Sequence, residues 1–229
     1  MPADTNIKMI KTVVHGLGEL SKEIVFVGGA VTELYIEDKS QISEIRQTDD
    51  VDCIIEITSR KNYVALEEQL RKQKFENDQK VICRWHYKGI TVDIMPTDPK
   101  ILGFSNRWYS EGIIHSIPFD IAKNISIRIL AIPYFIGCKL EALFNRGLSD
   151  LRLSKDLEDI VFLLNYGTKV NVDKKELKKY ISNQVEILLS KPELREAIFC
   201  LLPFGENAPP YVDNIIKELT ILTKQKRYA

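Results

Sequence analysis

The spacing of apolar and polar positions divides the chain into a first part with short strands and helices and a second part with helices only. Apolar runs of strand length occur in "EIVFVGGAV", "VDCIIEI" and "ITVDIMP", each bounded by Gly, Asp or Pro. Apolar residues three to four apart predict helices over residues 5–20 and 62–73. "VICRWHY" and "ITVDIMP" flank Lys88-Gly89, which predicts a β-hairpin, and "GIIHSIPF" and "ISIRILA" predict two further strands.

From about residue 132 the pattern is that of helices alone. Pro133 stands near the start of one predicted helix, Gly147 is its C-cap, and Ser154 is the N-cap of the next. Two more helices are predicted over residues 173–200 and 209–224.

The change of pattern predicts a mixed α+β fold. We expect a small mixed β-sheet with flanking helices over residues 1–120 and an all-helical C-terminal domain over residues 121–229. A chain of 229 residues is long enough for two such domains with a sizeable core.

Charge and hydropathy exclude some classes of protein. The net charge is zero, so the chain has no global basic field of the kind that nucleic-acid binders use. Residues 1–120 carry 15 Lys and Arg against 19 Asp and Glu, whereas residues 121–229 carry 17 against 13. No segment approaches the roughly 20 apolar residues of a membrane span, and the N-terminus lacks the apolar core of a signal peptide. We therefore predict a cytoplasmic protein without a membrane partner.

The four cysteines, Cys53, Cys83, Cys138 and Cys200, are scattered and form no Cys-x-x-Cys pair. Three of them lie in apolar runs, which predicts buried free thiols in a reducing compartment.

Three aspartates stand where the apolar run "VDCIIEI" begins. Because alternate side chains of a strand share a face, Asp50 and Asp52 point the same way, while Val51 and Cys53 face the core. Two carboxylates on one face can bind a hard divalent cation such as Mg²⁺. Taken alone, the Asp49-Asp50 pair is more typical of a turn before a strand.

A third carboxylate, Asp93, occurs in "ITVDIMP". Val92 and Ile94 are expected to face the core, which leaves Asp93 on the opposite face of another strand. Alone, it also fits a solvent-facing residue of an edge strand. Gly28-Gly29 joins a strand to a helix, where backbone N–H groups can approach a phosphate, although such a pair is also common in tight connections. In combination, these features favour metal-dependent phosphate chemistry.

The order of Gly-Gly, Asp-x-Asp and a later single Asp resembles the polymerase-β-like nucleotidyltransferase superfamily over about residues 22–96. "VGGAVTELYIED…TDDVDCII" is similar to the Gly-Gly and Asp-x-Asp motifs of CCA-adding enzymes and their relatives. The resemblance implies a small nucleotidyltransferase sheet in which Gly28 and Gly29 bind the triphosphate of an NTP. It also implies that Asp50 and Asp52 hold two Mg²⁺ ions, and that Asp93 completes the metal site and helps deprotonate the acceptor hydroxyl.

The helical part contains "CKLEALFNRGLSDLRLSKDLEDIVFLL", which resembles the later motifs of abortive-infection, AbiEii-type nucleotidyltransferase toxins. This resemblance implies that Lys139 contacts the nucleotide phosphate and that Asp156 is a catalytic or lysine-orienting carboxylate. Arg146 lies two helical turns after Lys139, so both can face one cleft. The helix dipole alone would also favour Asp156 and Asp159 in a first turn, and Lys139 could extend to solvent from an apolar helix.

The resemblance implies an enzyme that transfers NMP from an NTP to an acceptor hydroxyl, such as an RNA or tRNA 3′ end, with a cognate antitoxin as a partner. Two other acceptors stay open, namely a small molecule of the aminoglycoside kind and a protein hydroxyl. Outside catalysis, the alternatives are a non-catalytic nucleotide-binding protein and a plain interaction module.

Overall fold

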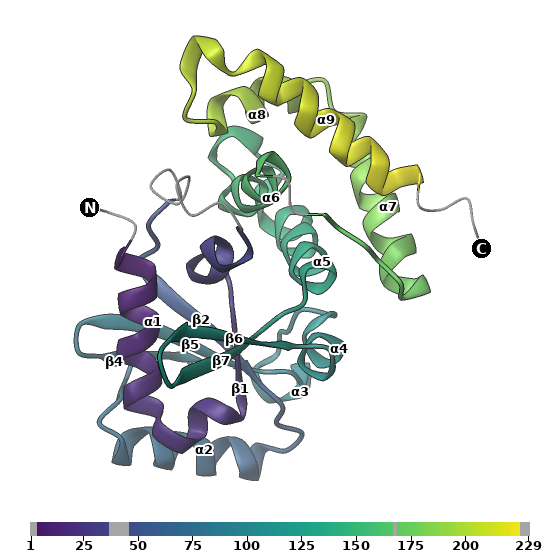
Figure 1. Cartoon of the computed structure of the whole chain (residues 1–229). Coiled ribbons are helices and arrows are strands. Elements are labelled where there is room, and N and C mark those ends of the chain that lie inside the picture. Colours follow the sequence, from purple (N-terminus) through teal and green to yellow (C-terminus); the bar gives the residue numbers. More distant parts are fainter. Residues whose placement is uncertain (1–3, 37–45, 167–168, 225–229) are drawn as a thin grey trace. The chain divides into compact units, whose positions relative to one another are not determined.

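The computed structural model describes residues 4–36, 46–166 and 169–224 (Figure 1). The described residues form two compact units. The first contains the described residues up to Leu34 and those from Arg46 to Ala131, and the second contains Tyr35, Ile36 and the described residues from Ile132 onward. The predicted α+β fold is confirmed, because the first unit contains a mixed sheet and the chain then continues as helices.

The sheet has seven strands in the order β3-β4-β5-β2-β1-β7-β6. β2 runs parallel to β5 and β1 runs parallel to β7, whereas all other neighbours are antiparallel. The strands are β1 (Ile24–Val27), β2 (Asp50–Ile55), β3 (Glu76–Asn77), β4 (Arg84–Tyr87), β5 (Ile90–Pro96), β6 (Ile117–Ala122) and β7 (Ile125–Ile129).

Residue 120, the predicted domain boundary, lies within β6. The first compact unit extends past this residue to Ala131, beyond the end of β7, and the division into two domains stays a prediction.

The strand patterns follow their places in the sheet. β1 lies near the middle and is buried at all four positions. The predicted hairpin is confirmed: β4 and β5 turn at Lys88 and Gly89, whose φ angles are 49° and 78°. Two consecutive positive φ angles are what a two-residue type I′ hairpin requires, and glycine adopts them without strain.

The helices of the first unit are α1 (Asp4–Leu17), α2 (Arg60–Lys72), α3 (Pro99–Leu102) and α4 (Tyr109–Ile114). α1 packs across β2 and β5 (Figure 1). The strand predicted for "GIIHSIPF" is wrong in its first half, because Gly112 to Ile114 close α4 and the strand begins at Ile117. Apolar runs this short do not distinguish a strand from a helix by their pattern. The segment after β1 is a 3₁₀ helix, η2 (Gly29–Tyr35).

The second unit consists of α5 (Ile132–Ala142), α6 (Lys155–Asn165), α7 (Lys175–Leu189), α8 (Leu194–Leu201) and α9 (Pro209–Lys224). α5 packs against α6 and α7, and α7 and α9 lie side by side (Figure 1). Ser154 is the N-cap of α6, since its hydroxyl accepts a hydrogen bond from the backbone N–H of Leu157 at 3.2 Å. The single helix predicted over residues 173–200 is instead the pair α7 and α8.

The four cysteines are free thiols, and three of them, Cys53, Cys83 and Cys138, are buried as predicted, whereas Cys200 is exposed. Burial, with a smaller contribution from the nearby Asp93 carboxylate, raises the pKa of the Cys83 thiol to about 11. Among the helices of the described residues, none has the length and apolar content that a membrane crossing needs.

Candidate metal and nucleotide site

β2 places the two aspartates of the Asp-x-Asp motif on one face. Val51 and Cys53 are fully buried, and the intervening Asp50 and Asp52 are only half-buried, which confirms the alternation predicted from the sequence. The carboxylates therefore lie at a partly open surface, where water or a ligand can reach them.

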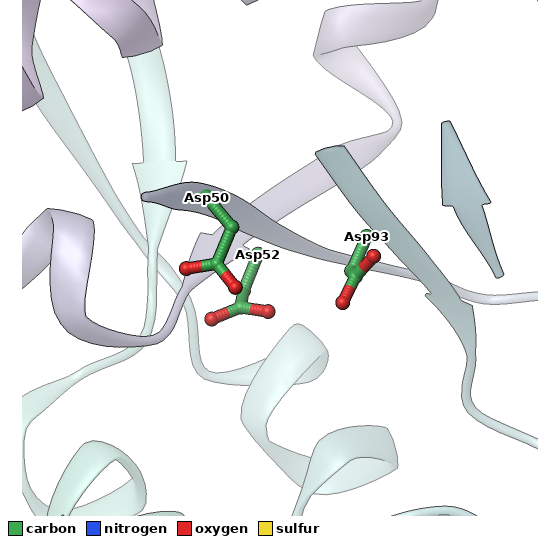
Figure 2. Close-up of side chains that lie close together, drawn as sticks. All are labelled: Asp50, Asp52 and Asp93. Atoms are coloured by element: carbon green, nitrogen blue, oxygen red, sulfur yellow. The ribbon is translucent and has the colours of Figure 1, made fainter. Parts of the chain in front are cut away.

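The neighbouring strand β5 brings in the third carboxylate. β2 and β5 are parallel, and their register pairs Asp52 with Asp93. Val92 and Ile94 are fully buried on the opposite face, and Asp93 is 9% exposed. One oxygen from each of Asp50, Asp52 and Asp93 lies within 4.8 Å of the others (Figure 2). The structure thus brings together the three carboxylates that the sequence singled out, and we call them the aspartate cluster.

The chemistry of the aspartate cluster fits a divalent cation. Its donors are carboxylate oxygens, which hard cations such as Mg²⁺ prefer. Three carboxylates at this separation repel one another unless a positive charge lies close by. The two half-buried members are also partly accessible from outside the protein.

The glycine turn touches the aspartate cluster directly. β1 and β2 pair Val27 with Asp52, so Gly28 follows immediately beside that aspartate. Gly28 has φ 74°, and a Cβ there would lie 2.7 Å from the carboxylate carbon of Asp52. A Cβ on Gly29 would lie 2.8 Å from Nη2 of Arg46. Only glycine lets the backbone approach these side chains so closely.

We expect Gly28→Ala to weaken metal binding as well as stability. The left-handed backbone alone costs about 1–2 kcal/mol for a non-glycine residue, and the new methyl group must displace the Asp52 carboxylate. Gly103→Ala is the matched control, because Gly103 has φ 84° and nothing within 4 Å of its Cβ position. Urea unfolding and Mn²⁺ titration of both variants test the expectation. Equal Mn²⁺ affinity in both would contradict a role for Gly28 in placing Asp52.

Sequence reasoning missed two groups that position the aspartate cluster. The first connects α1 to the start of β2. The side-chain oxygen of Asn6 accepts hydrogen bonds from the backbone N–H of Thr48 at 3.1 Å and from its hydroxyl at 3.3 Å. The Thr48 hydroxyl also lies 3.0 Å from the carbonyl oxygen of Asp50, so its single proton is shared between this oxygen and that of Asn6. Asn6 is more than forty residues away in sequence, and no local pattern indicates this contact.

The second missed residue is Arg84 on β4. Its Nε donates to Oδ1 of Asp93 at 2.8 Å, and its Nη2 donates to Oδ2 at 2.8 Å. The hairpin turn at Lys88-Gly89 places Arg84 opposite Asp93, so the register of the predicted hairpin contained the signal.

The negative charge of the aspartate cluster contributes to the raised pKa values of two neighbouring groups, the Arg84 guanidinium and the Cys53 thiol. Hydrogen bonding to Asp93 raises the pKa of the Arg84 guanidinium, and the Asp93 and Asp50 charges raise it further. Burial raises the pKa of the Cys53 thiol well above its usual value, and the charges of Asp52 and Asp93 add to the effect. Cys53 is therefore a neutral thiol beneath the aspartate cluster at physiological pH.

In the helical unit, Lys139 on α5 forms ion pairs with two aspartates of α6. Its Nζ lies 2.5 Å from Oδ2 of Asp159 and 3.3 Å from Oδ1 of Asp156. All three residues are buried, with exposed fractions of 8%, 3% and 4% in the order Lys139, Asp159, Asp156. The exposed Arg146 donates from Nε to Asp156 at 3.0 Å. The structure brings together Lys139 and Asp156, both singled out from the sequence, and their roles toward a nucleotide stay predictions.

Comparison with known proteins identifies solved structures that have a similar fold. The sequence matches no protein-family model and no curated protein sequence. The structure is similar to that of an antigenic nucleotidyltransferase-like protein from Paracoccidioides brasiliensis. The TM-score is 0.57 and the sequence identity 20%, and the match covers 85% of this chain and 92% of that one. The chain has a nucleotidyltransferase-like fold. A protein from H. pylori, named as a candidate nucleotidyltransferase, agrees with a TM-score of 0.53 and 14% identity, over 98% of this chain and 96% of that one.

At identities this low the likeness establishes the nucleotidyltransferase-like fold alone. What this chain adds is its own set of side chains on that fold, namely the aspartate cluster and the glycine turn beside it.

Proposed function

We propose that the protein is a Mg²⁺-dependent nucleotidyltransferase that transfers NMP from an NTP to an acceptor hydroxyl. The observation that carries the proposal is the aspartate cluster on β2 and β5, in contact with Gly28, within a nucleotidyltransferase-like fold. We further propose an RNA 3′ end, in particular that of tRNA, as the acceptor, a cytoplasmic location, and an antitoxin as a partner. These finer proposals rest on the resemblance of the helical motifs to AbiEii-type toxins.

Each part of the site has a separate role in this proposal. Asp50 and Asp52 hold the metal, and Asp93 completes the site and accepts the proton of the attacking hydroxyl. The backbone of Gly28 and Gly29 binds the triphosphate. When bound, two Mg²⁺ ions stabilise charge on the attacking and the leaving oxygens of such a transfer. The oxygen of the acceptor hydroxyl forms a bond to the α-phosphorus, the bond to the bridging oxygen breaks, and pyrophosphate leaves.

Lys139 and Asp156 belong to the same proposal in supporting roles. Lys139 contacts the nucleotide phosphate, and Asp156 orients the lysine, in line with the 3.3 Å separation of their charged atoms. Positioning and electrostatic stabilisation carry such a reaction, so the protein needs no covalent intermediate of its own.

The experiment is incubation of the purified protein with Mg²⁺, each labelled NTP and total cellular RNA, beside an Asp50→Ala/Asp52→Ala variant. We expect label on a discrete RNA band with the wild type alone, and the effective NTP identifies the transferred base. Label on a small molecule or a protein would refute the RNA acceptor and keep the nucleotidyltransferase. If the protein neither bound Mg²⁺ with an NTP nor released pyrophosphate, the enzyme proposal would fall and a non-catalytic module would take its place.

A further inference from the structure

Arg84 occupies both oxygens of the third carboxylate. β4 and β5 pair Arg84 directly with Asp93, and the guanidinium makes two hydrogen bonds of 2.8 Å, one to each carboxylate oxygen. A bidentate pair of this kind is the strongest contact that an arginine makes with a carboxylate. The same carboxylate has an oxygen within 4.8 Å of oxygens of Asp50 and Asp52. One side chain is therefore shared between an arginine and the aspartate cluster.

If Asp93 bound a divalent cation while it was paired with Arg84, its carboxylate would contact two positively charged groups, the cation and the guanidinium. Each carboxylate oxygen keeps a second lone pair, so the competition is electrostatic and not a complete block. The repulsion is strong because Asp93 is almost buried and water screens the charges poorly there. The Arg84 charge also acts on Asp50, a second member of the cluster.

Of the two partners, Arg84 is the one that can leave. Its side chain is 33% exposed, whereas that of Asp93 is 13% exposed and lies on β5, which has a paired strand on each side. A released guanidinium on the flexible arginine stem can be hydrated at the surface, so release does not strand an unpaired charge in the interior.

We propose that Arg84 and the divalent cation compete for Asp93, so that metal binding releases Arg84 from it. This inference rests on the proposed function and deepens it by assigning a regulatory role to a residue of the site. In the metal-free protein Arg84 neutralises part of the cluster and keeps Asp93 from the acceptor hydroxyl. Binding of the metal then makes Asp93 available.

The test is Mn²⁺ titration without nucleotide, followed by electron paramagnetic resonance of the free ion at constant ionic strength. We expect Arg84→Gln to bind Mn²⁺ about tenfold more tightly than the wild type, because the substitution removes a positive charge that repels the cation at Asp93. Arg71→Gln is the matched control, because Arg71 is exposed on α2 and pairs with Glu67 and Asn77. It removes the same charge from the same unit and is expected to change the affinity little.

The outcomes separate this inference from the proposed function. Unchanged or weaker Mn²⁺ binding by Arg84→Gln, with binding by the wild type intact, would overturn the competition alone. Absence of Mn²⁺ binding in every variant would overturn the metal site and the competition with it. A second measurement uses the wild-type protein. The Nε–H of Arg84 is expected to exchange faster with solvent when Mg²⁺ is added. An unchanged exchange rate would contradict release of Arg84.

Discussion

Asp52→Asn is expected to abolish Mg²⁺-dependent nucleotide transfer while leaving the fold intact. Asp52 is the member of the aspartate cluster that lies between the glycine turn and Asp93, so its charge acts on both parts of the site. Asparagine has nearly the same shape but no charge, and loss of one preorganised electrostatic group typically lowers turnover by about 10²–10³-fold. We expect a loss at the upper end, about 10³-fold, because a metal ligand is removed. The measurement is the rate of pyrophosphate release with saturating NTP.

Asp52→Asn is also expected to change the stability of the protein in a direction that a merely damaged variant would not show. Three carboxylates within 4.8 Å repel one another without a cation, so neutralising one should leave the metal-free protein at least as stable as the wild type. Added Mg²⁺ is expected to raise the melting temperature of the wild type, because a ligand that binds only the folded state stabilises it. Asp52→Asn should lose most of that rise.

Asp120→Asn is the control for this experiment. Asp120 is exposed on β6 of the same unit. Its substitution changes the net charge by the same amount as Asp52→Asn, but away from the aspartate cluster. It should retain wild-type turnover and the Mg²⁺-dependent rise in melting temperature. Wild-type turnover in Asp52→Asn would mean that the proposed metal site is wrong.

Lys139→Met is expected to have the largest effect on stability. It leaves the buried carboxylates of Asp156 and Asp159 without the lysine charge that lies 3.3 and 2.5 Å from them. Removing one partner of a buried ion pair typically costs about 3–5 kcal/mol, because the other charge stays buried. In a chain of this size 1 kcal/mol shifts the melting temperature by about 2–4 °C, so we expect a fall of about 10 °C.

Arg146→Gln is the matched control for the lysine. Arg146 also binds Asp156, but its own side chain is 73% exposed, so water screens its charge and we expect its loss to cost about 1 kcal/mol or less. Urea unfolding can follow the two units separately. Far-UV circular dichroism is weighted toward the helices, and fluorescence reports the first unit, since both tryptophans, Trp85 and Trp108, belong to it. The circular dichroism midpoint should fall in Lys139→Met and change little in Arg146→Gln.

A double variant separates the structural role of Lys139 from its proposed contact with the nucleotide. Lys139→Met/Asp159→Leu replaces the ion pair by apolar side chains, which is often neutral or stabilising in a protein interior. It should be more stable than Lys139→Met, and an additive loss would refute the coupling of the two charges. If Lys139 also binds phosphate, the stable double variant should still have low transfer activity.

The sequence determined the parts of the site that depend on local periodicity. A strand alternates its side chains, so the order of residues in β2 was enough to place Asp50 and Asp52 together and Val51 and Cys53 in the core. The hairpin followed from Lys88-Gly89, because few residue pairs accept two positive φ angles. With the hairpin its register was also determined, which is why Arg84 could have been found opposite Asp93 from the sequence alone.

Short apolar segments were less informative. "GIIHSIPF" fits a strand by composition, yet its first residues close the helix α4, with Ile113 buried and Ile114 exposed. A helix of six residues spans fewer than two turns, which is too short for its period to be read.

Only the tertiary structure decided which separated segments meet. β2 and β5 are not consecutive strands, and their parallel pairing, which puts Asp52 beside Asp93, depends on how the whole sheet is assembled. The contacts of Gly28 with Asp52, Asn6 with Thr48 and Lys139 with Asp159 are of the same kind. Hydrophobic periodicity arises within a few residues and so can be read locally. The meeting of distant segments is set by close packing of the complete core, in which every element limits the position of the others.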